Sequence, residues 1–140
     1  MPGYTNQFNK LELKTTAQDM TVLMDHTAEK ARSYSQDYEF FFYKTGMKIK
    51  GYRIGQNIPL DGTTINCTID EEIPLSSAIS ISINPDIQKL IFKSDATVQL
   101  QQNDATFVTA NNCAIHIVNV HGASCNIFVN TQTGETIIED

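Results

Sequence analysis

Beyond residue 38 the chain alternates between apolar and polar positions, the period-two pattern of strands with one buried face. The alternation is clearest between Ala78 and Ile83, where Ile79, Ile81 and Ile83 are separated by serines. We predict strands over residues 38–43, 47–54, 63–69, 78–83, 87–93, 96–100, 105–109, 114–120, 125–129 and 136–138. Short links rich in Gly, Pro, Asn and Asp leave no room for crossover helices, so the pairing should be antiparallel.

Strands of this length and spacing indicate a β-sandwich or a small barrel. Our prediction is a mainly β protein with an antiparallel, jelly-roll-like β-sandwich, an N-terminal arm and one short helix. No fixed repeat period is present, which argues against a β-solenoid. The dense aromatic segment at 38–43 and the strand at 47–54 should form a hairpin around the turn at 44–46.

The one predicted helix covers residues 16–34. Thr16 and Asp19 resemble the two polar positions of a capping box, which places the helix start there. The apolar positions that follow near helical spacing are Met20, Leu23, Met24, Ala28 and Ala31. Residues 1–14 hold few apolar anchors and are predicted to be an arm, with a short strand possible at 11–13. The predicted division is 1–37 for the arm and helix and 38–140 for the β-sandwich.

Charge and composition limit the classes of partner and the cellular compartment that we expect for this protein. The 140 residues carry a net charge of −6, which argues against nucleic acid as a partner. Residues 1–53 hold eight Lys and Arg against six acids, whereas residues 54–140 hold two against ten. No apolar window approaches the roughly 20 residues that span a bilayer, and three cysteines with no signal segment favour a reducing compartment. We therefore expect folding in a cytoplasm.

Four potential metal ligands, Cys113, His116, His121 and Cys125, lie within thirteen residues. On a strand, Cys113 and His116 would point to opposite faces, so the pattern is better explained by small buried thiols than by a metal site. The acidic group at 70–72 is best explained as a solvated turn. No Gly-rich phosphate loop or Gly-x-Ser-x-Gly motif is present. We predict no enzymatic activity, no cofactor and no metal.

Residues 38–43 place aromatic side chains on both faces of one strand. One of these faces should pack into the core of the domain. The second face must be covered by the helix or by a partner. Basic residues follow directly, and they could meet the acidic half of a neighbouring copy. The predicted interface residues are Phe40, Phe41, Phe42, Tyr43, Lys48, Lys50 and Arg53.

The C-terminal half carries a family resemblance. It comprises a strand and acidic turn at 87–95, a short polar strand at 96–100, a strand at 114–120 and a closing strand after a Gly/Ser turn at 122–129. In these features, mainly within 87–140, the sequence resembles small β-sandwich accessory proteins of tailed-bacteriophage virions, of the neck, head-fibre or tail-adaptor type. The resemblance implies a non-enzymatic structural protein that forms a homo-oligomer, binds other virion proteins and is located in the virion after assembly in the host cytoplasm.

Two other function classes remain open from the sequence. One is a carbohydrate- or ligand-binding β-sandwich module that uses exposed Tyr and Asn side chains at loop ends. The other is an enzyme or metalloprotein built around Cys113, His116, His121 and Cys125. Our prediction from the sequence is the structural protein, because its assembly surface is the feature that the aromatic strand and the uneven charge both indicate.

Overall fold

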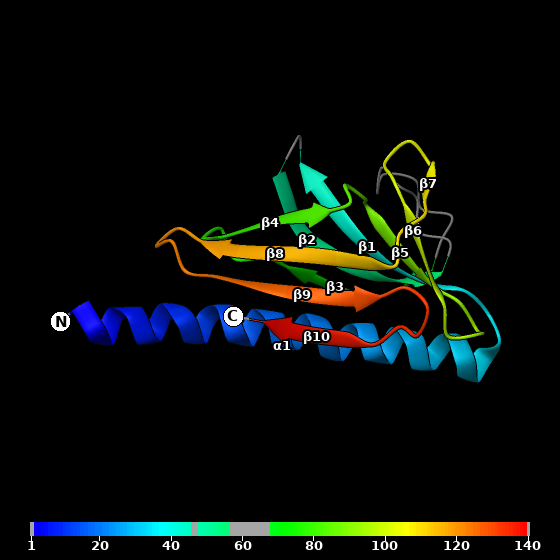
Figure 1. Cartoon of the computed structure of the whole chain (residues 1–140), viewed down its shortest axis with the longest axis horizontal. Helices are drawn as coiled ribbons and strands as arrows, with labels where there is room; N and C mark the ends of the chain where they lie inside the picture. Colours follow the sequence, from blue (N-terminus) through cyan, green and yellow to red (C-terminus); the bar gives the residue numbers. More distant parts are fainter. Residues whose placement is uncertain (1, 46–47, 57–67, 140) are drawn as a thin grey trace.

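The computed structural model describes residues 2–45, 48–56 and 68–139, in which one long helix precedes ten strands (Figure 1). The elements are α1 (Pro2–Tyr34), β1 (Tyr38–Thr45), β2 (Lys48–Gln56), β3 (Thr68–Pro74), β4 (Ile79–Asn84), β5 (Lys89–Phe92), β6 (Val98–Gln101), β7 (Phe107–Val108), β8 (Asn112–Asn119), β9 (Ser124–Asn130) and β10 (Thr136–Glu139). The predicted strand at 63–69 and Cys67 lie largely or wholly outside the described residues, and β3 begins at Thr68.

The strands form two antiparallel sheets. The six-stranded sheet has the order β3-β2-β1-β5-β6-β7, and the four-stranded sheet has the order β10-β9-β8-β4. The predicted hairpin is confirmed, because β1 pairs with β2 from Glu39–Gly55 to Thr45–Lys48. The prediction of a mainly β protein with antiparallel strands and one N-terminal helix is therefore confirmed. Two packed sheets are consistent with a sandwich. The jelly-roll-like connectivity stays a prediction.

The helix is much longer than predicted. It runs from Pro2 to Tyr34, so the expectation of an N-terminal arm over residues 1–14 is wrong. Thr16 does not cap the helix: it lies in the helix interior, where its hydroxyl donates a hydrogen bond to the Glu12 carbonyl oxygen at 3.0 Å. The physical reason is packing, since most helical stability in proteins comes from a buried face and not from local start signals.

The buried face of the helix begins before the predicted start. Its members follow each other at intervals of three or four residues. They are Leu13, Ala17, Met20, Met24, Thr27 and Ala31, and Leu23 is buried beside them. Thr27 is the polar member, and its hydroxyl donates to the Leu23 carbonyl oxygen at 2.6 Å, so its burial leaves no unmet donor.

One hydrophobic core joins the helix to both sheets. The helix contacts β8, β9 and β10 of the four-stranded sheet and β1, β2 and β5 of the six-stranded sheet. Figure 1 shows α1 running along β9 and β10, with its first turns extending past the ends of the strands. The chain passes from helix to strand between Tyr34 and Tyr38, and the predicted division at residue 37 stays a prediction about folding units.

Candidate functional site

The aromatic strand β1 is buried on both faces within the single chain. Phe40 and Phe42 face the main core, where the Phe40 ring stacks on Tyr52 with centroids 5.1 Å apart. Phe41 points to the opposite face of the sheet and is 0% exposed. None of the three rings offers surface to a partner in this state, although their assignment to an interface stays a prediction.

Tyr43 and Arg53 contact each other. The Arg53 guanidinium lies 4.7 Å from the centroid of the Tyr43 ring, a cation–π distance, and its Nε is 3.3 Å from a carboxylate oxygen of Glu72. Burial raises the pKa of the Tyr43 hydroxyl, and the negative charge of Glu72 adds to that effect. Two of the seven predicted interface residues are thus engaged in a network that links β1, β2 and β3.

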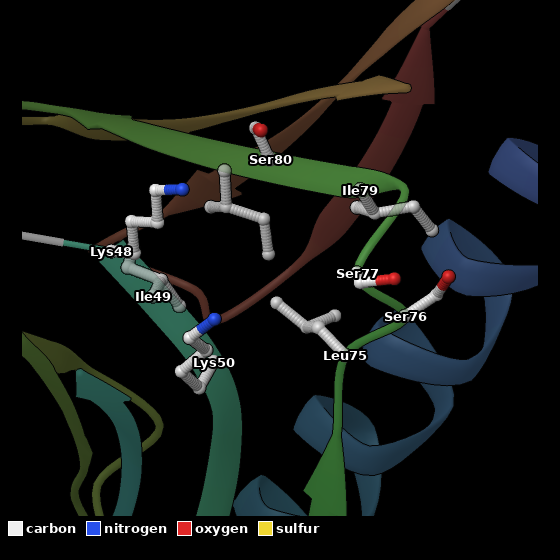
Figure 2. Close-up of a pocket in the computed structure, with 9 residues that line it drawn as sticks. Lys48, Ile49, Lys50, Leu75, Ser76, Ser77, Ile79 and Ser80 are labelled. Carbon is white, nitrogen blue, oxygen red and sulfur yellow. The ribbon is translucent and has the colours of Figure 1, made fainter. Parts of the chain in front are cut away.

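The other two basic residues, Lys48 and Lys50, are exposed at the start of β2 and border a groove of about 400 Å³. Figure 2 shows the groove between β2, the segment that leads into β4, and β4 itself. The described residues that line it are Lys48, Ile49, Lys50, Leu75, Ser76, Ser77, Ile79, Ser80 and Ile81.

The chemistry of the groove suits binding. Its aliphatic side chains offer apolar contact, and its two ammonium groups and three serines offer hydrogen-bond donors. Among the described residues that line the groove there is no carboxylate, imidazole or thiol. Sequence reasoning found the two lysines and the strand at 78–83, but missed the groove, because nothing in the Ile-Ser alternation shows that β4 lies at a sheet edge beside β2.

The four potential metal ligands Cys113, His116, His121 and Cys125 do not converge. Cys113 and Cys125 are buried on the core face of the four-stranded sheet, and burial raises the pKa of the Cys113 thiol to about 12. His116 is on the other face, where its Nδ1 lies 2.8 Å from the Asn126 side-chain oxygen. His121 is exposed. Among the described residues, no group of three or more His, Cys, Asp or Glu side chains is placed to hold a metal ion.

The part of the chain that the structure describes contains no helix that is both long enough and apolar enough to cross a membrane. The helix α1 has the length, at 33 residues, but polar and charged side chains are spread along it.

A long N-terminal helix packed along two antiparallel sheets defines the fold class, and solved structures with this architecture exist. Two crystal forms of the type IV minor pilin FimU from Pseudomonas aeruginosa strain PAO1 are similar to this chain. The P21 form has a TM-score of 0.67 at 14% identity and covers 94% of this chain and 90% of FimU. The P65 form has a TM-score of 0.58 at 15% identity, covering 91% and 93%. No family model matches the chain, and no curated protein matches its sequence.

These comparisons correct the predicted identity. The predicted relation to bacteriophage accessory proteins is wrong, because the similar structures are those of a pilus protein. The structural similarity extends over nearly the whole of this chain. The predicted role in a phage particle and the predicted location in a virion are wrong for the same reason. The strand-turn-strand features at 87–129 are common to many antiparallel sheets, so they could not separate one family from the other. The alternative of a carbohydrate-binding module gains no support.

Proposed function

We propose that this protein is a non-enzymatic subunit of a type IV pilus or a related filament of the cell envelope. The observation that carries the proposal is the mutual coverage with FimU, which includes the helix as well as both sheets. A fold shared at 14% identity does not fix a function, so the proposal needs independent support from the surface of this chain.

The outer face of the helix supplies that support. Leu11 is 60% exposed and Val22 is 50% exposed, on the side of α1 that does not pack on the sheets. Two apolar side chains exposed on the same side of one helix are available for contact with a further protein surface. In a filament, neighbouring subunits would provide that surface. A homo-oligomer is one form of this arrangement, and other filament proteins are the partners that the proposal favours.

The test is incorporation into filaments. An epitope-tagged chain would be expressed in the organism that encodes it, and filaments would be sheared from the cell surface and probed for the tag. Leu11→Glu combined with Val22→Glu should remove the tag from the sheared fraction. Phe107→Glu should not, because Phe107 is similarly exposed, at 57%, but lies on β7, away from the helix.

Each variant would first be checked for an unchanged unfolding midpoint, so that a folding defect is not mistaken for lost assembly. A wild-type chain that is absent from sheared filaments, while a known filament subunit is present, would contradict the proposal. Equal incorporation of the helix variant and the wild type would contradict the role of the outer helix face in assembly.

A further inference from the structure

The two sheets have four edge strands, and three of them are protected against pairing with another chain. β3 carries Asp70, Glu71 and Glu72 and ends at Pro74. β7 has two residues, and β10 has four, includes Glu139 and contacts the helix. Charges, proline, short length and coverage are the devices by which sheet edges avoid association.

β4 lacks the charges, the proline and the very short length, and it contacts β2 beside the groove. Its six residues alternate isoleucine and serine before Asn84 and contain no charge and no proline. On one side β4 pairs with β8 over its whole length, from Ile79–Asn119 to Asn84–Ala114. On its other side no described strand pairs with it. Its six residues make an uncharged edge that is longer than β7 and β10 and one residue shorter than the charged β3.

The direction of the free backbone groups follows from the register. The Val120 amide donates to the Ala78 carbonyl oxygen at 2.9 Å, so the pairs that bond to β8 are those at even-numbered positions of the strand. The N–H and C=O groups of Ile81 and Ile83 therefore point away from β8. An incoming extended backbone would find donors and acceptors there at the spacing of a strand.

The side chains beside this edge narrow the kind of strand that fits. Ile81 and Ile83 are only half-buried, and Ile79 and Ile81 line the groove next to Leu75 and Ile49. Aliphatic side chains at alternate positions of an added strand would cover them. Lys48 and Lys50 border the same groove, and Figure 2 shows their two ammonium groups there. Among the described residues that line the groove, none is acidic. A carboxylate is the complementary group.

We propose that the open edge of β4 and the adjoining groove bind an extended segment of a partner protein as an additional strand. The segment carries aliphatic side chains at alternate positions and a carboxylate that reaches Lys48 or Lys50. This inference does not rest on the proposed role in a filament, since it depends on the sheet edge and the groove alone.

The probe is a fluorescein-labelled peptide, Glu-Thr-Ile-Thr-Ile-Thr-Glu, blocked at both ends. In a strand its two Ile and two Glu side chains share one face, so either orientation places a carboxylate near the lysines. Fluorescence anisotropy with the whole chain should show saturable binding. A peptide with Lys in place of both Glu should bind at least about tenfold more weakly.

Two variants separate the backbone and charge contributions. Ile81→Pro removes an outward N–H but no bond to β8, and Lys48→Glu with Lys50→Glu reverses the charge at the groove. Each should raise the dissociation constant by at least about tenfold. The matched control is Lys14→Glu with Arg32→Glu, which changes the net charge equally at exposed sites on the helix and should leave binding unchanged. The lysine variant keeps the test decisive if Ile81→Pro does not fold.

Amide hydrogen exchange gives a second readout. The amides of Ile81 and Ile83 should exchange quickly in the free protein and slowly with the peptide bound. Absence of binding at about 1 mM peptide, or equal binding of the Glu and Lys peptides, would overturn the proposal. Self-association of the chain that Ile81→Pro abolishes would also overturn it, because the occupant would then be a second copy.

Discussion

The Lys89 ammonium nitrogen lies 3.0 Å from a carboxylate oxygen of Glu39, and both side chains are largely buried, at 7% and 13% exposed. The strand register explains the contact, because β1 and β5 pair Glu39 with Ile91 and Phe41 with Lys89, which makes the two charged residues diagonal neighbours. They share a sheet face with the buried side chains of Phe41 and Ile91, opposite the main core. Removing one partner of a buried ion pair strongly destabilises a protein, because the other charge stays buried without compensation.

Glu39→Gln should therefore lower the free energy of unfolding by about 3 kcal/mol, because it leaves the Lys89 charge buried without its partner. Urea denaturation would measure the loss. The double variant Glu39→Leu with Lys89→Met, which removes both charges, should recover most of the lost stability. A change below about 0.5 kcal/mol for Glu39→Gln would show that the pair is solvated in solution.

Tyr52 makes the stability sensitive to high pH. Burial against Phe40 raises the pKa of its hydroxyl from about 10 to about 12, with smaller contributions from the charges of Asp19 and Glu71. Between these two values the unfolded chain releases a proton that the folded chain keeps. The free energy of unfolding should therefore fall as pH rises from 10 to 12, by up to about 3 kcal/mol from this group.

Tyr52→Phe isolates this contribution. The variant should lose stability less steeply than the wild type over the same pH range, and the two should run parallel below pH about 9. The buried Cys113 thiol also has a raised pKa, but it is present in both proteins and cancels in the comparison. Chemical denaturation at a series of pH values would give both curves. Identical slopes would contradict a buried Tyr52 hydroxyl.

Gly51 is required by the ring that packs over it. In the β1–β2 pair it lies opposite Tyr43, and a methyl group at position 51 would overlap the Tyr43 hydroxyl and the Ile73 carbonyl oxygen. The Ile73 carbonyl oxygen belongs to the backbone of the paired strand β3, so the overlap could be relieved only if that strand moved. Gly51→Ala should cost about 2–3 kcal/mol of unfolding free energy.

The control for Gly51 is a glycine with a different constraint. Gly122 has a φ of +86° and nothing within 4 Å of the place where a Cβ would stand. Gly122→Ala should cost about 1 kcal/mol from its backbone conformation alone. Equal costs at the two positions would contradict the steric explanation for Gly51.

How far the sequence determined the structure depends on the range of the forces involved. Alternation depends on local geometry, so it located β4, β8 and β9 to within two residues at each end and placed Cys113 and His116 on opposite faces. Which strand lies at a sheet edge is decided by long-range pairing. The alternation of apolar and polar residues therefore could not predict that β4 lies at a sheet edge beside a groove, or that Phe41 is buried.

The helix start shows the same limit and gives a final prediction. Leu11 and Leu13 both lie in the segment that the sequence predicted to be an arm, yet Leu13 is 2% exposed in the core and Leu11 is 60% exposed. Leu13→Ala should cost about 2–4 kcal/mol of unfolding free energy because it leaves a cavity between helix and sheets. Leu11→Ala makes the same chemical change at an exposed helical position, where alanine is well tolerated, and should alter stability by less than about 0.5 kcal/mol. Thermal and urea unfolding of the two variants would compare them directly. Equal, small effects would mean that the helix before residue 16 does not pack on the sheets in solution and that the arm was the right description after all.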